Sequence, residues 1–258
     1  MDNKIDLSSL GSLFVKIYYN DIQLGSATAF IVNDNKQNYL VTNRHVVTGK
    51  NNITNKIINT MGAIPNKIIV EIPTYHPETN TFNWNKKTIN LYDSNENPIW
   101  MEHCEYKEKM DVVAIKLDES IKLSITYSLD SSNFLCSICD NVKIIGYPFG
   151  YNINPKQGYF AIWMSGTIAS EPLVNLIIPN TNIEIPGFLI DARTREGASG
   201  SPVIYYNRQG ILPNNNGFSI CSDAIRIPLG IYSGRISNES DLGIVWKWDV
   251  LKKIINSI

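Results

Sequence analysis

Short apolar segments, most of them rich in β-branched or aromatic residues, recur along the whole chain. Glycine, asparagine, aspartate or proline bounds most of these segments. The segments are residues 13–19, 28–32, 39–42, 67–72, 112–117, 141–145, 159–168, 188–190, 202–206, 227–232 and 243–246. Many short strands separated by turn residues are typical of a β-sandwich or β-barrel. The pattern therefore predicts an all-β fold.

One helix is expected, at the end of the chain. Asp249 is a suitable N-cap, and the residues after it repeat with helical spacing. The apolar residues on one face of this helix, 249–258, are Val250, Leu251, Ile254, Ile255 and Ile258. A chain of 258 residues can form two domains. The polar stretch 118–133 is the best candidate for the connection, so we expect domains at 1–125 and 126–258.

The composition excludes several classes of protein. Hydrophobic residues make up 43% of the chain and the net charge is -1, which excludes a mainly disordered state. Because 23 basic residues are balanced by 24 acidic ones, we expect no nucleic-acid partner. No apolar run approaches the roughly 18 residues of a membrane span, so no membrane partner is expected. Asp2 and Asp6 stand where a signal peptide has basic residues, which predicts a cytoplasmic location.

The four cysteines are Cys104, Cys136, Cys139 and Cys221. In a cytoplasmic protein we expect free, buried thiols rather than disulfides at these positions. Cys136 and Cys139 have the spacing of a zinc knuckle or redox motif, but a second knuckle is missing. A bound zinc ion remains the alternative at this pair.

The segment with the clearest chemistry is 191–203, which reads DARTREGASGSPV. A nucleophilic serine needs a tight turn that exposes its hydroxyl and directs nearby N–H groups to one point. Gly197 and Gly200 permit such a turn around Ser199. The N–H groups of Gly197 and Ser199 can then form an oxyanion hole. A simple Gly/Ser turn between two strands is the alternative interpretation.

A serine hydroxyl needs a base to remove its proton, and the chain has three histidines. His45 lies in NYLVTNRHVV (38–47), where an apolar strand runs into a polar turn, whereas His76 and His103 lie in polar, irregular segments. A buried carboxylate should hold the imidazole in position. Asp111, in KMDVVAIKL (109–117), begins an apolar strand and is costly to bury unless it is paired. An ordinary strand-start aspartate is the alternative.

In the order His45, Asp111, Ser199, these motifs resemble the trypsin/chymotrypsin-like serine peptidases. VKIIGYP (142–148) and WMSGTI (163–168) are similar to the first strands of the second barrel in that family. The resemblance implies two six-stranded antiparallel Greek-key barrels with a C-terminal helix. The first barrel would carry His45 and Asp111, and the second would carry Ser199. Bacterial Deg-type and glutamyl-endopeptidase-like members look most similar, although no room is left for the PDZ domain of the Deg-type proteases.

What the resemblance implies is a serine endopeptidase that needs no metal or organic cofactor. Ser199 would attack the scissile carbonyl, and His45 would accept the serine proton and pass it to the leaving amine. Asp111 would orient His45, and the N–H groups of Gly197 and Ser199 would bind the oxyanion. We expect protein or peptide substrates and an activating or regulatory protein partner, because a cytoplasmic protease must be specific or gated.

The resemblance also suggests residues that bind substrate. Arg193 takes the position of the acidic residue at the base of the trypsin pocket, so cleavage after Lys or Arg is not expected. Thr194 matches a threonine that holds substrate carboxylates in glutamyl endopeptidases, but Tyr232 replaces their histidine. Ser233 matches a serine that contacts the triad aspartate, and Arg235 falls near the pocket mouth. An acidic P1 residue and a small or apolar one therefore both remain open.

Two other functions compete with this interpretation. A catalytically silent trypsin-fold binding or regulatory module would usually lack a triad residue, whereas all three are present here. An esterase would more often place its serine in a Gly-x-Ser-x-Gly elbow between strand and helix, with the histidine last in the chain.

Overall fold

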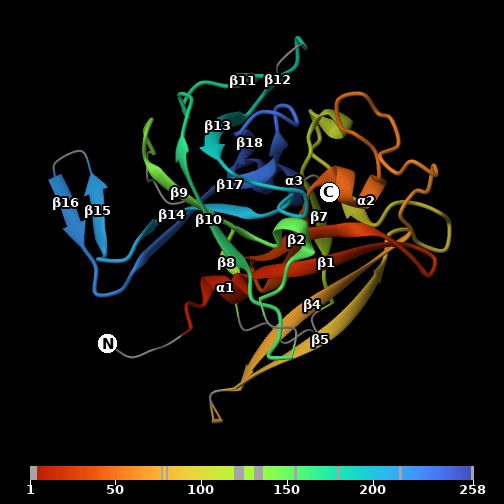
Figure 1. Cartoon of the computed structure of the whole chain (residues 1–258), viewed down its shortest axis with the longest axis horizontal. Helices are drawn as coiled ribbons and strands as arrows, with labels where there is room; N and C mark the ends of the chain where they lie inside the picture. Colours follow the sequence, from red (N-terminus) through yellow and green to blue (C-terminus); the bar gives the residue numbers. More distant parts are fainter. Residues whose placement is uncertain are drawn as a thin grey trace.

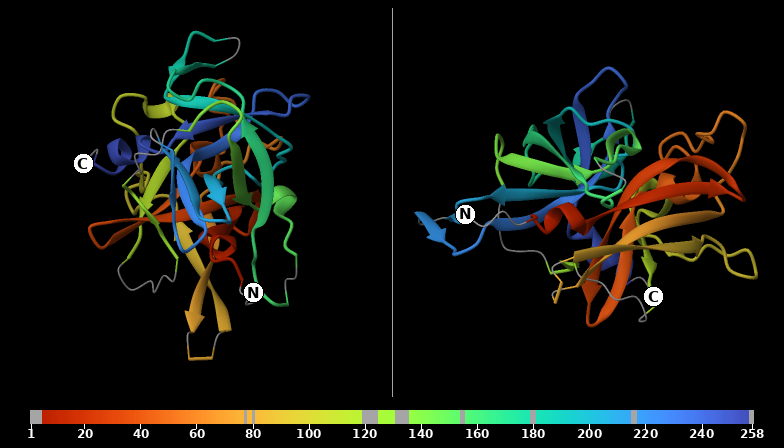
Figure 2. Two further views of the ribbon diagram at one scale, coloured as in Figure 1. Left: turned by 90° about the vertical axis from the view of Figure 1, so that its left-hand side faces the viewer. Right: turned by 60° about the horizontal axis from the view of Figure 1, so that its bottom comes forward.

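The computed structural model describes residues 5–76, 78–79, 81–118, 125–130, 136–153, 156–178, 181–214 and 217–256. Strands dominate it and form two units that lie side by side, with the red and orange strands beside the green and blue ones (Figures 1 and 2). The all-β class predicted from the sequence is confirmed. None of the described helices exceeds six residues, which is too short for a membrane span.

The first unit is an eight-stranded sheet in the order β5-β4-β1-β2-β3-β7-β6, with β8 paired to β2. In chain order its strands are β1 (Ser12–Tyr19), β2 (Ile22–Asp34), β3 (Gln37–Thr42), β4 (Lys67–His76), β5 (Thr81–Asn90), β6 (Trp100–Met101), β7 (Val113–Lys116) and β8 (Tyr127–Ser128). The ladder ends at β5 and β6. Just beyond these ends, the Ile99 N–H donates to the Leu91 carbonyl at 3.1 Å and the Asp93 N–H donates to the Asn97 carbonyl at 2.9 Å, so a short antiparallel pairing links the two edges.

The second unit is a closed six-stranded barrel in the order β10-β13-β18-β17-β14-β9, and the β9–β10 pair closes it. All of its strand pairs are antiparallel, as expected. In chain order its strands are β9 (Asn141–Gly146), β10 (Ile162–Ile168), β13 (Gly187–Ala192), β14 (Pro202–Asn207), β17 (Ile225–Arg235) and β18 (Leu242–Lys247). The division at residue 125 stays a prediction, and β8 at 127–128 pairs with the first sheet.

Short elements decorate the two units. Two small hairpins are formed by β11 (Leu176–Ile177) with β12 (Glu184–Ile185), and by β15 (Ile211–Asn214) with β16 (Gly217–Ile220). The helices are α1 (Ser8–Gly11), α2 (Arg44–Thr48) and α3 (Val250–Ile255), and the 3-10 turns are η1 (Lys107–Lys109) and η2 (Pro148–Gly150).

Strand β2 is buried on both faces, and this explains its continuous apolar run. Ala29 and Ile31 face the core of the first sheet, whereas Phe30 faces a second cluster shared with the end of the chain. The Phe30 ring stacks on Trp248 with 5.3 Å between centroids, and Leu251 of α3 joins the same cluster. Successive side chains of a strand point to opposite faces, so one strand holds the sheet and the C-terminal segment together.

The predicted C-terminal helix is confirmed as α3, which buries Val250, Leu251, Ile254 and Ile255. Asp249 stands at the predicted N-cap position, but its side chain makes no capping hydrogen bond. Asp249 already has helical angles (φ -64°, ψ -19°), whereas a side-chain cap needs an extended residue at this position. Ile258, predicted on the same face, lies outside the described residues.

The four cysteines are free, as expected, but the prediction that they are buried is wrong. Cys104, Cys139 and Cys221 are exposed, and Cys136 is half-buried. All four lie in turns or irregular segments between strands, where side chains commonly face solvent, and only Cys136 packs against the apolar core of the barrel.

Candidate active site

His45 is placed by the junction between β3 and α2. Strand β3 ends at Thr42, whose hydroxyl donates to the Thr28 carbonyl at 2.8 Å. Asn43 keeps an extended backbone and donates from its side chain to the Asp111 carbonyl at 2.6 Å. Helix α2 then begins, with His45 in its first turn. The junction therefore brings His45 to the start of the segment that leads into β7.

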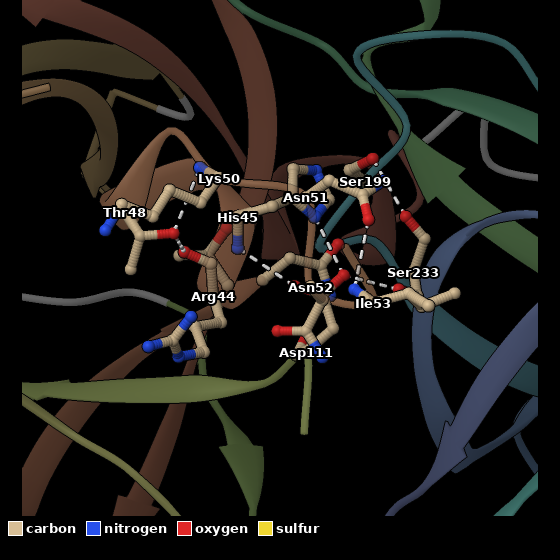
Figure 3. A network of polar contacts seen from close by, with 12 residues as sticks. Arg44, His45, Thr48, Lys50, Asn51, Asn52, Ile53, Asp111, Ser199 and Ser233 are labelled. Carbon is tan, nitrogen blue, oxygen red and sulfur yellow. Dashed lines mark hydrogen bonds and ion pairs between the residues drawn. The ribbon is translucent and has the colours of Figure 1, made fainter. Parts of the chain in front are cut away.

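His45 and Asp111 are joined by two hydrogen bonds (Figure 3). The His45 backbone N–H donates to Asp111 Oδ1 at 2.9 Å, and Nδ1 lies 2.7 Å from Oδ2. Because a carboxylate only accepts hydrogen bonds, the second contact places a proton on Nδ1 and leaves Nε2 with a lone pair. Burial by itself lowers the pKa of His45, but the Asp111 charge and hydrogen bond outweigh it and raise the pKa above 6.5.

Ser233 links this pair to the nucleophile segment. Its hydroxyl donates to Asp111 Oδ2 at 2.5 Å, and its carbonyl accepts the Ser199 hydroxyl at 2.9 Å. Among the hydrogen bonds of the described residues, Ser199 has none to His45. The three triad candidates thus meet at one place, with the serine hydroxyl turned toward Ser233 (Figure 3).

The turn around Ser199 requires glycine at two positions. Gly197 has φ +88° and Gly200 has φ +83°, in the left-handed region that side chains rarely adopt. A Cβ at Gly197 would lie 2.3 Å from the Tyr147 carbonyl oxygen, and one at Gly200 would lie 2.1 Å from that of Thr28. Both glycines are therefore needed for conformation and for space.

The peptide bond between Glu196 and Gly197 has a fixed orientation. The Glu196 carbonyl accepts a hydrogen bond from the Phe149 N–H at 2.5 Å. Because the carbonyl and N–H of a trans peptide point in opposite directions, the Gly197 N–H is directed away from Phe149. Within the described residues, neither the Gly197 nor the Ser199 N–H donates to a protein acceptor, so both are available to an oxyanion.

Thr28 supports this turn and was not predicted from the sequence. Its hydroxyl donates to the Gly197 carbonyl at 2.8 Å and accepts the Tyr147 N–H at 3.0 Å. Its backbone N–H donates to the Ser199 carbonyl at 2.9 Å. Thr28 is 169 residues from Gly197 in the chain, so no local motif marks this role. Phe149 was missed as well, and only the turn residues Pro148 and Gly150 around it gave a signal.

The arginines predicted to bind substrate have different partners. The Arg193 side chain is 88% exposed, and its Nε lies 3.8 Å from Asp241 Oδ2. Arg235 donates from Nη1 to the Asn238 carbonyl at 2.7 Å and lines the cavity that contains the triad candidates. No shared contact brings the two guanidinium groups together among the described residues.

Thr194 and Tyr232 form a buried pair. Thr194 is fully buried and Tyr232 is 2% exposed, and their hydroxyl groups are hydrogen-bonded to each other. Burial raises the pKa of Tyr232, so the phenol stays protonated. The Thr194 hydroxyl is therefore already engaged within the protein.

A cleft extends on both sides of His45 and Ser199. On one side is a cavity of about 260 Å³, whose lining includes Asp111, Ser233 and Arg235 besides several apolar side chains. On the other side is a cavity of about 620 Å³ that also contacts Gly197. Two cavities that share the candidate nucleophile and base suit an extended peptide that crosses between them. No group of three or more His, Cys, Asp or Glu within the described residues could hold a metal ion.

Comparison with known proteins identifies the family. The model of the trypsin-like peptidase domain matches residues 27–211, which is more than half of the chain. The chain belongs to the trypsin-like peptidase family. It is thus a serine-type endopeptidase, a hydrolase whose substrates are proteins or peptides. No curated protein matches this trypsin-like peptidase.

Solved structures share the fold of this trypsin-like peptidase at low sequence identity. A thermostable serine protease, AL20, from an extremophilic microorganism matches with a TM-score of 0.53 and 12% identity, covering 98% of each chain. The active form of the Rv3671c protease from M. tuberculosis matches with a TM-score of 0.52 and 14% identity, covering 96% of this chain and 80% of its own. A serine endoprotease from Yersinia pestis has a TM-score of 0.51 and 15% identity, over 96% and 62% respectively.

Proposed function

We propose that this peptidase cleaves specific protein substrates through an acyl-enzyme on Ser199, with His45 as base and Asp111 as its orienting acid. The observation that carries the proposal is the 2.7 Å contact of His45 Nδ1 with Asp111 in a cleft that also contains Ser199. This contact leaves the lone pair on Nε2, the atom that must accept the serine proton.

The reaction begins with a rotation of the Ser199 side chain. Its hydroxyl leaves the Ser233 carbonyl and turns to His45, which takes the proton as Oγ attacks the scissile carbonyl carbon. The N–H groups of Gly197 and Ser199 receive the oxyanion, and one such donor is worth about 3 kcal/mol in a related mechanism. His45 then gives the proton to the leaving amine. Water attacks the acyl-enzyme by the same steps and restores Ser199.

The proposed substrates are not cut after Lys or Arg. Arg193 stands six residues before Ser199, where a carboxylate would be needed to bind a basic side chain. Arg195 lies nearby, with Nη1 bonded to the Thr194 carbonyl at 2.7 Å. Asp241 lies 3.8 Å from Arg193 Nε and 3.7 Å from Arg195 Nη1, so it is the missing carboxylate at position 193, rather than a net positive charge, that disfavours a cationic P1 residue.

An activating protein partner and a cytoplasmic location complete the proposal. The hydrogen bond from Ser199 to the Ser233 carbonyl supports a resting state that a partner or a substrate must release. The location is supported by the four free cysteines, because proteins of oxidising compartments more often pair such residues in disulfides.

Labelling with a fluorophosphonate probe tests the proposal. The wild-type protein should be labelled, and Ser199→Ala should not, with turnover of a cleaved protein reduced on the order of 10⁶-fold. Ser237→Ala, a change in an exposed turn, is the matched control and should be labelled like the wild type. A folded wild-type protein that stays unlabelled even when a cell extract supplies candidate partners would instead indicate a catalytically silent binding module.

A further inference from the structure

Tyr232 is held beside the turn that carries the candidate nucleophile. Its carbonyl accepts the Gly200 N–H at 2.9 Å, and its own N–H donates to the Ser201 carbonyl at 2.9 Å. Two backbone hydrogen bonds therefore tie β17 at Tyr232 to the two residues that follow Ser199. The position of the Tyr232 side chain is set relative to the site of bond cleavage.

The Tyr232 ring packs in the same apolar cluster as Ala198, the residue before Ser199. At one end its hydroxyl is bonded to Thr194, on the segment that leads into Ser199. Along its edge it contacts Gly243 of β18, where a Cβ would lie 2.5 Å from Cε2. The ring thus reaches from β17 to both neighbouring segments, and only 2% of the residue is exposed.

In trypsin-like peptidases, a pocket beside the nucleophile receives the side chain before the scissile bond and sets specificity. We propose that the Tyr232 ring fills this pocket and limits the P1 residue to glycine, alanine or serine. Protein interiors are close-packed, so a larger P1 side chain would have to displace the ring. Displacement would also break the hydrogen bond to Thr194 and leave its buried hydroxyl without a partner. This inference rests on the proposed role of Ser199.

A series of peptides with Ala, Leu, Phe or Glu at P1 checks the proposal. The series is tested on the wild type, Tyr232→Val and Tyr232→Phe. The wild type should prefer Ala over Leu and Phe by about 100-fold or more in kcat/KM. Tyr232→Val removes the ring and should reduce this preference below about tenfold. Tyr232→Phe keeps the ring and removes the hydroxyl, so it should retain the wild-type order.

Three results would overturn the proposal. The first is a wild type that cleaves after Leu or Phe within tenfold of Ala, and the second is a folded Tyr232→Val that still accepts only small P1 residues. The third is a wild-type preference for Glu that Tyr232→Phe abolishes, which would make the phenol a carboxylate ligand.

If Tyr232→Val does not fold, covalent labelling of the wild type alone tests whether the Tyr232 ring fills the P1 pocket. A diphenyl phosphonate with an alanine side chain should label Ser199, and the phenylalanine analogue should not. Equal labelling by both would overturn the inference. A fluorophosphonate without a P1 side chain separates the two proposals, because absence of this labelling counts against Ser199 as nucleophile rather than against the filled pocket.

Discussion

The two halves of the candidate active site differ in how far their hydrogen bonds suit catalysis before substrate binds. In the half built on the first sheet, Asp111 accepts from the His45 backbone, the His45 ring and Ser233, so the base is already oriented. In the half built on the barrel, the Ser199 hydroxyl donates to a carbonyl instead of to the base.

This difference suggests which contacts position the catalytic groups in each half. The acid–base pair depends on contacts within the protein and should be independent of substrate. The nucleophile needs one side-chain rotation, which a substrate carbonyl placed near the Gly197 and Ser199 N–H groups can favour. Changes in the first half should therefore act on kcat through the base, and changes in the second half through the positions of backbone donors.

The largest effect should come from Asp111→Asn. An amide in place of the carboxylate can no longer hold a proton on Nδ1 of His45, and the analogous change in a Ser-His-Asp enzyme lowers kcat about 10⁴-fold. Steady-state kinetics on a cleaved peptide gives the measurement. Asp118→Asn, which alters an exposed carboxylate 3.1 Å from Lys87, should stay within about threefold of the wild type. A loss below tenfold for Asp111→Asn would show that the first half is not pre-organised as described.

Thr28→Val should have the next largest effect, in the nucleophile half. Valine keeps the shape but removes the hydroxyl that serves both the Gly197 carbonyl and the Tyr147 N–H. An unsatisfied buried group costs about 1–3 kcal/mol, so we expect kcat to fall roughly 10- to 100-fold with little change in KM. Thr28→Ser restores the hydroxyl and should recover most of kcat. An equal loss in both variants would mean that only packing matters at this position.

The sequence predicted strands where apolar residues are buried, and missed them where backbone pairing alone forms the strand. The predicted segment 112–117 contains β7, in which Val113 and Ile115 are buried. Strand β5 is absent from the apolar segments found in the sequence, because Asn, Lys and Thr interrupt its apolar residues and most of its side chains are exposed. It forms through a continuous ladder with β4. The β15–β16 hairpin, which is also absent from the predicted segments, forms for the same reason.

The site was predictable in its residue types and not in its side-chain directions. The motifs around His45, Asp111 and Ser199 are local, and each reads clearly in the sequence. The direction of the Ser199 hydroxyl depends on the Ser233 carbonyl, 34 residues away, and the place of Tyr232 depends on Thr194 and Gly243 on other segments. Such long-range contacts set rotamers, and no local pattern encodes them.

The pH dependence of kcat/KM should report on the His45–Asp111 pair. We expect a smaller effect than those of the substitutions above, about tenfold in kcat/KM per pH unit below the midpoint. Catalysis needs neutral His45, whose pKa is raised above 6.5, so kcat/KM should rise with a midpoint above pH 6.5. Stability changes in the opposite sense. Because folding raises the pKa of His45, protonation of this residue stabilises the folded protein. This contribution to the free energy of unfolding is complete below pH 6.5 and is lost as the pH rises through the pKa of the folded state.

Paired profiles of kcat/KM and thermal unfolding between pH 5 and 9 measure both trends. Because the Asp111 charge and hydrogen bond raise the pKa of His45, the Asp111→Asn midpoint should move below that of the wild type. A midpoint that does not move on this change would contradict the assigned cause of the shift.

The smallest effect should come from Arg235, at the edge of the cleft. Its guanidinium lines the cavity beside Ser233 and its Nη1 already has a carbonyl partner, so it can add only a partly solvated attraction to an acidic substrate side chain. Such pairs are worth up to about 1 kcal/mol, which corresponds to a three- to fivefold preference for Glu over Gln at P2 or P3. Arg235→Gln should remove this preference for Glu, and 1 M salt should weaken it in the wild type. The control Lys252→Gln, on α3, should leave the preference intact. If the preference survives in Arg235→Gln, we would instead attribute the selection for acidic residues to Arg193 or Arg195, on the segment before Ser199.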